Sequence, residues 1–212
     1  MRVALVDYDS GNLHSAEKAF QRMAAETGAG SVIVSSDPAD VARADRIVLP
    51  GDGAFPACKA ALEAVPGMVE VLRDAVETRA VPFMGICVGM QMLADIGHEY
   101  RDTPGLGWIG GEIDLIRPSE PGLKVPHMGW NDLRLRGAHP VLDGIATGDH
   151  AYFVHSWQFH PKDPAHLLAD VDYGGSVTAI VGRDNIVGTQ FHPEKSQAVG
   201  LRIIENFLNW RP

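Results

Sequence analysis

The chain contains only two cysteines among its 212 residues, Cys58 and Cys87. They lie far apart, and no CxxC pair or Cys/His cluster indicates a zinc site. Two separated thiols in a chain without an export signal are typical of a cytoplasmic protein that keeps its thiols reduced. We therefore expect free cysteines, no bound metal and a cytoplasmic location.

The chain also lacks an excess of basic residues and any long apolar run. Its 18 Lys and Arg residues are outnumbered by 27 Asp and Glu residues, which gives a formal net charge of -9. Proteins that bind nucleic acid usually carry the opposite charge, so binding to a phosphate backbone is not expected. The apolar run Val3–Val6 is followed by Asp7 and is too short for a signal peptide or a membrane span.

Short apolar runs alternate with amphipathic stretches in the first half of the chain. The predicted strands are Val3–Val6, Ser31–Val34, Arg46–Leu49 and Val81–Ile86. The predicted helices are Leu13–Ala24 after the capping pair Asp9–Ser10, Asp37–Ala44, Met68–Arg79 and Val88–Ile96. This alternation predicts a mostly parallel sheet with helices on both faces.

The second half of the chain is richer in short strands and tight turns. The turn segments Tyr173–Ser176 and Arg183–Asn185 predict antiparallel hairpins, and Val199–Trp210 predicts a final helix. No repeat, low-complexity tract or interdomain linker is present. We therefore expect residues 1–212 to form one α/β domain, with a mostly parallel central sheet, flanking helices and antiparallel hairpins in its C-terminal half.

The segment Gly85–Gly89 (GICVG) has the spacing of a nucleophile elbow with a thiol. It lies where a predicted strand becomes a helix, so Cys87 would project from a sharp turn at the carboxyl end of the sheet. The helix N-terminus favours a thiolate there. The alternative is a buried structural cysteine, because free cysteines are often buried. Cys58 lies in a helical stretch and is interpreted as structural or incidental.

The segment Gln190–Glu194 (QFHPE) is the best candidate for a base and its orienting group. Pro193 makes this turn rigid, and the spacing lets the Glu194 carboxylate reach the His192 imidazole. A thiol nucleophile needs such a base. Taken alone, the segment could equally be a surface loop with solvated side chains; together with the elbow it predicts a catalytic triad.

These two segments together resemble the triad-type (class I) glutamine amidotransferases, and the resemblance covers nearly the whole chain. Further segments resemble one group in that family, the glutaminase subunits of imidazole glycerol phosphate synthases. They are Tyr8–Leu13, Pro50–Phe55, Lys124–Asn131, Tyr152–Trp157 and Lys195. That group takes part in making the imidazole ring of histidine and releases an aminoimidazole carboxamide ribotide used in purine synthesis.

The resemblance implies a role for each matching residue. The catalytic residues would be Cys87, His192 and Glu194; the oxyanion hole would be formed by Gly51, Asp52, Gly53 and Val88; and glutamine would be bound by Gln91, Glu99, Ser156 and Trp157. One position departs from the family, which usually has an apolar residue where this chain has Asp52. A carboxylate there would oppose the developing negative charge, so its side chain must point away.

The resemblance also implies a partner, a (β/α)₈-barrel cyclase that receives ammonia in a heterodimer. The chain has no phosphate loop for the acceptor substrate and no cofactor motif. Asn12, Trp130 and Lys195 are the expected interface residues. Two alternatives remain: the glutaminase of anthranilate, GMP or pyridoxal phosphate synthesis, and a non-catalytic regulatory relative. The loop Met128–Trp130 and Lys195 disfavour the first, and the intact triad disfavours the second.

Overall fold

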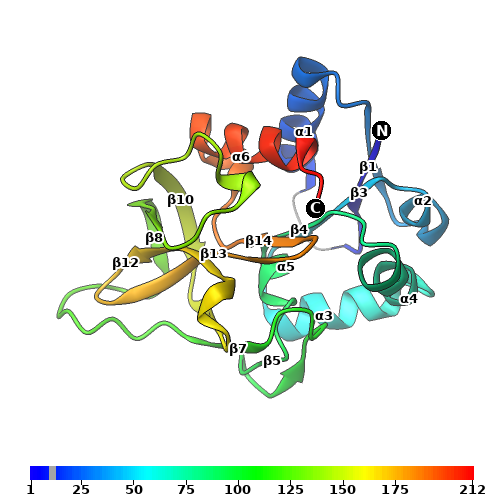
Figure 1. The fold of residues 1–212 in the computed structure, drawn as a ribbon. Coiled ribbons are helices and arrows are strands. Elements are labelled where there is room, and N and C mark those ends of the chain that lie inside the picture. Colours follow the sequence, from blue (N-terminus) through cyan, green and yellow to red (C-terminus); the bar gives the residue numbers. More distant parts are fainter. Residues whose placement is uncertain (10–12) are drawn as a thin grey trace.

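The computed structural model describes residues 1–9 and 13–212, and its centre is an eight-stranded sheet in the order β2-β1-β3-β4-β14-β13-β12-β9 (Figure 1). In that order, the strands are Ser31–Ser35, Arg2–Val6, Arg46–Gly51, Phe83–Cys87, Ile186–Thr189, Ser176–Arg183, Leu167–Asp172 and Arg134–Leu135. Neighbours from β2 to β14 pair in parallel, whereas β13, β12 and β9 are added by antiparallel pairing. The predicted α/β fold with C-terminal hairpins is confirmed.

Two smaller sheets lie beside the C-terminal half of the central sheet. One has the order β11-β7-β5-β6, and the other pairs β10 with β8. Their strands are β5 (Ile96–Gly97), β6 (Thr103–Pro104), β7 (Gly111–Leu115), β8 (His127–Asp132), β10 (His150–His155) and β11 (Trp157–Pro161). Only Ser156 separates β10 from β11, so the chain passes directly from one small sheet to the other.

Helices cover both faces of the central sheet. Figure 1 shows α1 (Leu13–Thr27) and α6 (Gln197–Asn209) together on one face, and α3 (Phe55–Ala64) with α4 (Met68–Arg73) on the other. Short helical elements complete the fold: α2 (Pro38–Ala42), α5 (Val88–Gln91), a π-helical turn (Asp74–Thr78) and 3₁₀ turns at Pro140–Leu142, Pro164–His166 and Pro193–Lys195. The rings of Phe20 and Phe207 join α1 to α6 edge to face, with centroids 6.3 Å apart.

One predicted helix changes type along its length, and another is wrong in its C-terminal part. The helix that begins at Met68 changes to π-helical geometry from Asp74 to Thr78. The helix expected over Val88–Ile96 ends at Gln91. The backbone carbonyls of Met92, Leu93 and Ala94 instead accept hydrogen bonds from N–H groups of the segment 106–109. A segment distant in sequence therefore uses the acceptors that the helix would need in order to continue.

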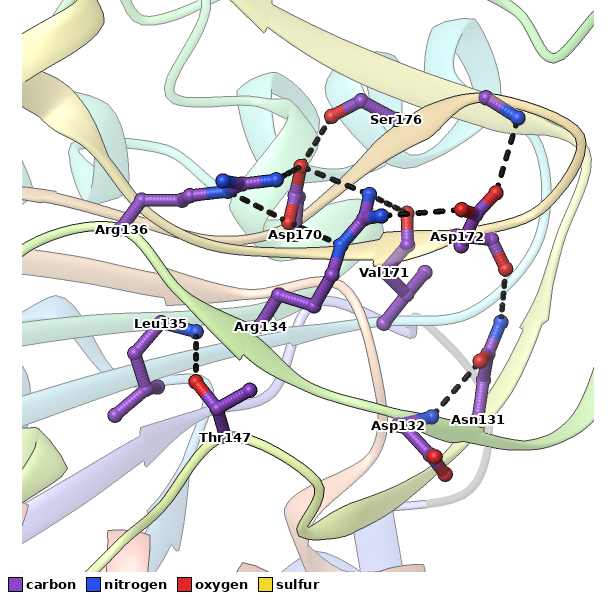
Figure 2. A network of polar contacts seen from close by, with 11 residues as sticks. Asn131, Asp132, Arg134, Leu135, Arg136, Thr147, Asp170, Val171, Asp172 and Ser176 are labelled. Carbon is purple, nitrogen blue, oxygen red and sulfur yellow. Dashed lines mark hydrogen bonds and ion pairs between the residues drawn. The ribbon is translucent and has the colours of Figure 1, made fainter.

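A partly buried ionic network joins the edge strand β9 to β12 (Figure 2). Asp170 is 1% exposed and accepts paired hydrogen bonds from Arg134 and Arg136, with shortest distances of 3.0 and 2.9 Å. Ser176 also donates to this carboxylate. Burial alone would raise the pKa of Asp170, but hydrogen bonds from Arg136, Ser176 and Arg134 outweigh it and hold that pKa below its ordinary value.

Candidate active site

Cys87 lies at the turn between β4 and α5, at the carboxyl end of the parallel strands. Its backbone has φ 54° and ψ -113°, a conformation that residues other than glycine rarely adopt. Its side chain is largely buried. The expected elbow is therefore present, and it holds the sulfur in a strained turn of the kind found at functional sites.

The glycines two residues before and after Cys87 are required by close packing. A Cβ on Gly85 would lie 2.5 Å from the carbonyl oxygen of Gly89, and a Cβ on Gly89 would lie 1.8 Å from the carbonyl oxygen of Leu49. Both obstacles are backbone atoms, which cannot move aside as a flexible side chain can. The G-x-C-x-G spacing therefore allows the turn to pack against itself and against β3.

His192 and Glu194 form a buried pair beside the sulfur. The distance from His192 Nδ1 to Glu194 Oε1 is 2.8 Å, and the two side chains are 8% and 4% exposed. Burial lowers the pKa of His192, but hydrogen bonds with Cys87 and Glu194 outweigh it and raise that pKa to about 10. These contacts therefore favour the protonated imidazolium form of His192.

Ser196 fixes the turn that carries His192. Its hydroxyl donates to the carbonyl oxygen of His192 at 2.7 Å and accepts from the N–H of Tyr152 at 3.0 Å. The N–H of His192 donates in turn to the carbonyl oxygen of Tyr152 at 3.3 Å. This turn is thereby attached to β10. Sequence reasoning missed Ser196, because a serine after a His-Pro-Glu turn has no distinguishing pattern.

A cavity of about 230 Å³ opens beside Cys87. It is lined by Asp52, Gly53, Cys87, Val88, Gln91, Glu99, Pro126, Val154, His155, Ser156 and Trp157. All four expected glutamine-binding residues therefore share one cavity with the sulfur and with three of the four expected oxyanion residues. The fourth, Gly51, pairs with Cys87 across β3 and β4. Asp52 is exposed, as a carboxylate beside an oxyanion site would have to be.

The side-chain amides of Gln91 and Gln190 connect the cavity wall to the sulfur. Gln91 Nε2 donates to the carbonyl oxygen of Trp157 at 3.2 Å and to Gln190 Oε1 at 3.1 Å. Gln190 Nε2 lies 3.7 Å from the sulfur of Cys87. The Gln91 oxygen is thus the group left for a ligand. Gln190 lies in the motif quoted above, but nothing in the sequence indicated its contact with a residue 103 positions away.

Glu99 is buried, and one oxygen of its carboxylate is already used. Its Oε2 accepts from the N–H of Phe55, the first residue of α3, at 2.7 Å. Two backbone carbonyls of the cavity wall are also occupied: that of Ser156 by the N–H of Ile116, and that of Trp157 by Gln91 and His155. A ligand carboxylate only accepts hydrogen bonds, so any partner on this part of the wall would be a backbone N–H and not a carbonyl.

The expected interface residues lie apart from the cavity lining. Trp130 is 47% exposed and Met128 is 62% exposed, and both lie on the outward face of β8. The ring of Trp130 contacts that of Tyr152 edge to face. This exposure excludes the alternative that Trp130 is a core residue. Lys195 is exposed next to the triad, and Asn12 lies outside the described residues.

Two further observations concern residues 1–9 and 13–212. In this part of the chain, no three His, Cys, Asp or Glu side chains are placed together as metal ligands would be. No helix there has both the length and the apolar composition needed to cross a bilayer.

A family model described as "Glutamine amidotransferase class-I" matches residues 5–210. The chain belongs to the class-I glutamine amidotransferases. Among amidotransferases of this class, it is 67% identical over 212 residues to "Imidazole glycerol phosphate synthase subunit HisH" of Cereibacter sphaeroides, with 100% of both chains covered. It is 58% identical over 214 residues to the protein of the same name in Rhodospirillum rubrum, again with 100% of both covered.

Solved structures of amidotransferases share the fold. One described as a glutamine amidotransferase superposes with a TM-score of 0.73 at 18% identity, covering 98% of this chain and 99% of that chain. A glutamine amidotransferase from Thermotoga maritima gives a TM-score of 0.62 at 16% identity, covering 92% of this chain and 76% of that chain. The family and the fold expected from the sequence are both confirmed.

Proposed function

We propose that this amidotransferase is the glutamine-hydrolysing subunit of imidazole glycerol phosphate synthase and supplies ammonia for histidine biosynthesis. The observation that carries the chemistry is the strained Cys87 at the wall of a cavity of about 230 Å³, beside a His192 that Glu194 orients. The choice of synthase is supported by full-length relatives that bear that name at 67% and 58% identity.

The first half of the reaction releases ammonia. The Cys87 thiolate attacks the side-chain amide carbon of glutamine, and the carbonyl π electrons move to oxygen. The Val88 N–H and an N–H from Gly51–Gly53 stabilise this oxyanion; removal of one such donor typically lowers the rate by about 10²–10³-fold. The intermediate then collapses to a thioester. Ammonia leaves with a proton that His192 supplies.

The second half hydrolyses the thioester. Neutral His192 removes a proton from water, and the resulting hydroxide attacks the thioester carbon. Glutamate leaves after its new γ-carboxyl group gives its proton to solvent water, and the Cys87 thiolate and the His192 imidazolium are restored. Glu194 holds the imidazole in the correct tautomer and stabilises its charged form through the 2.8 Å contact.

The remaining cavity residues fit the polar groups of glutamine. The free oxygen of Glu99 would accept from the α-ammonium, and the Gln91 oxygen would accept a further N–H. The backbone N–H groups of Ser156 and Trp157 would donate to the α-carboxylate. Asp52 is exposed and lines the cavity; we infer that its carboxylate faces solvent and that its backbone contributes to the oxyanion strand.

The ammonia needs a protected path to a partner, because ammonia released into neutral water would be mostly protonated. We infer that the partner is a (β/α)₈-barrel cyclase and that the acceptor is bound at the carboxyl face of its barrel. Trp130 and Lys195 are exposed and available for this contact, and Asn12 remains an interface prediction. The free thiols Cys58 and Cys87 suit a cytoplasmic location.

Substitution of the nucleophile tests the proposed function. In the complex with the cyclase, Cys87→Ala should abolish synthesis of imidazole glycerol phosphate from glutamine and leave synthesis from added ammonium salt intact. Cys58→Ala is the matched control and should keep both activities. If Cys87→Ala retained glutamine-dependent synthesis, or lost both activities, this division of labour would be wrong.

A further inference from the structure

Two buried histidines outside the triad contact each other beside the active-site cavity. His127 on β8 and His155 on β10 are 2% and 6% exposed, and the two residues pair across these strands. The distance from His127 Nδ1 to His155 Nε2 is 3.0 Å. The ring of Phe153 stacks on His127 with a centroid distance of 4.8 Å. The catalytic mechanism described above uses neither imidazole.

The donor and acceptor of each hydrogen bond in this pair can be assigned, starting from the Trp157 carbonyl at one end. The carbonyl oxygen of Trp157 can only accept, so His155 Nδ1 donates to it at 2.8 Å. His155 Nε2 is then an acceptor and receives the proton of His127 Nδ1. His127 Nε2 is an acceptor in turn and receives an N–H of Asn131 Nδ2 at 3.2 Å. All four ring nitrogens are therefore used, and only neutral rings satisfy them.

The charge states agree with this assignment. Burial lowers the pKa of His155 to about 3 and that of His127 to about 4. The far end of the chain of bonds is also anchored, because Asn131 donates to the carbonyl oxygen of Asp172 at 2.9 Å; Figure 2 shows these two residues side by side. The pair thus has a single protonation state at neutral pH, and it has no free nitrogen with which to exchange protons with a substrate.

The other end of this chain of bonds reaches the nucleophile. The Trp157 carbonyl accepts from Gln91 Nε2 as well as from His155, and Gln91 bonds to Gln190, whose amide contacts the Cys87 sulfur. His155 makes the shorter of the two bonds to that carbonyl, at 2.8 Å against 3.2 Å. Without the His155 donor, the carbonyl could turn, and the Gln91 amide would lose the acceptor that sets its orientation.

We propose that His127 and His155 are positioning residues for glutamine hydrolysis: they fix the Trp157 carbonyl and so hold the Gln91 and Gln190 amides in place at the cavity wall and at the sulfur. This inference rests on the proposed glutaminase function. It assigns the pair no proton transfer and no direct contact with the reacting carbon. Loss of the histidine pair should therefore affect the binding of glutamine more than the chemical step.

Two substitutions of His155 test the inference in the complex with the cyclase. His155→Leu removes the donor, whereas His155→Asn keeps an N–H near the position of Nδ1. The KM for glutamine should rise on the order of tenfold in His155→Leu, the effect of losing about one neutral buried hydrogen bond, with a smaller change in kcat. His155→Asn should recover most of that loss. His160→Leu, an exposed neighbour on β11, is the control and should match the wild type.

Ammonia-dependent synthesis reports whether each variant folds and assembles. A KM for His155→Leu within twofold of wild type, or an equal KM in the Asn and Leu variants, would overturn the inference. If His155→Leu also loses ammonia-dependent synthesis, the same comparison is made between His127→Leu and His127→Asn, with the same criteria. A wild-type complex that uses ammonia but not glutamine would instead refute the proposed function.

Discussion

At the scale of single residues, the site depends on the contacts that His192 makes with Cys87 and Glu194. The His192 pKa of about 10 lies above the ordinary value of 6.5 because of Cys87 and Glu194. The folded state therefore binds the proton of the His192 imidazolium more tightly than the unfolded state does. The stability that this proton contributes is complete below pH 6.5 and is lost as the pH rises through about 10.

Removal of the Glu194 carboxylate should weaken both catalysis and the pH dependence of stability that comes from His192. Glu194→Gln keeps the shape of the side chain, but it should lower kcat for glutamine by about 10²–10⁴-fold, the usual range for positioned acid–base catalysis. It should also lower the pKa of His192, measured by NMR titration, so that stability falls less between pH 6.5 and 10. Glu205→Gln, at a partly exposed carboxylate of α6 that pairs with Arg202, is the control. An unchanged kcat in Glu194→Gln would remove Glu194 from the mechanism.

The sequence predicts some site residues better than others, and the reason is physical. Cys87, His192 and Glu194 belong to short motifs in which backbone geometry and chemistry impose a fixed spacing. His127 and His155 act through partners that only the folded sheets bring together, so no local pattern distinguishes them from the other histidines.

At the scale of secondary structure, the strand-to-helix turn at Cys87 depends on close backbone packing. Gly89→Ala would place a methyl group 1.8 Å from the carbonyl oxygen of Leu49. We expect it to lower the free energy of unfolding by roughly 3 kcal/mol or more, because the clash is with backbone. The control is Gly137→Ala, whose methyl group would lie 3.5 Å from the nearest side-chain atom. Equal melting temperatures for the two variants would contradict this account of the elbow.

The network in Figure 2 gives a second prediction at this scale. Asp170→Asn would leave Arg134 and Arg136 without their shared carboxylate. Loss of one partner of a buried ion pair is strongly destabilising; because these arginines are 32% and 46% exposed, we expect a loss of about 2–4 kcal/mol in urea unfolding. Asp172→Asn, at a side chain 63% exposed, should change stability by about 0–1 kcal/mol.

The pH dependence of stability checks whether the ion pairs of Asp170 cause the loss predicted for Asp170→Asn. Because the folded-state pKa of Asp170 is lowered, its contribution is present above the ordinary value of 3.8 and is lost as the pH falls through the lowered value. The gap in stability between wild type and Asp170→Asn should therefore narrow in strong acid. A difference in stability that stays constant from pH 7 to pH 2 would show that the charge of Asp170 is not the cause of the loss.

The sequence pattern predicts the secondary-structure elements better than it predicts where they end. The alternating pattern predicted the parallel strands and the helices on both faces. It could not show that α5 ends at Gln91, because the backbone groups that replace its helical bonds come from residues 106–109. The apolar spacing of the residues after Gln91 reflects burial, which a helix and a packed turn can both require.

At the scale of the whole molecule, the outward face of β8 is the best candidate for partner contact, since Met128 and Trp130 are exposed apolar side chains on one strand. Trp130→Ala should weaken binding to the cyclase by about 2 kcal/mol or more if Trp130 is an interface hot spot. Its melting temperature as an isolated chain should stay close to wild type. Calorimetric titration measures the first quantity, and Tyr100→Ala, at an 85% exposed residue, is the control.

The effect of the partner on the rate of glutamine hydrolysis also concerns the whole molecule. Because the sequence has no phosphate-loop motif for the acceptor, we expect the isolated chain to hydrolyse glutamine poorly and the proposed cyclase partner, with its ligand, to raise the rate. The comparison needs only a glutamate-release assay with and without the partner. An isolated chain that matches the complex would show that this coupling is absent.

The central claim is that Cys87 is the nucleophile that attacks glutamine. The most direct measurement is peptide mass spectrometry of the complex after treatment with 6-diazo-5-oxo-L-norleucine, a glutamine analogue with an electrophilic carbon. The account predicts one adduct, on Cys87, that excess glutamine prevents. Cys58 should stay unmodified, because burial raises the pKa of its thiol to about 11. A fully active complex with no adduct on Cys87, or with the adduct only on Cys58, would contradict it.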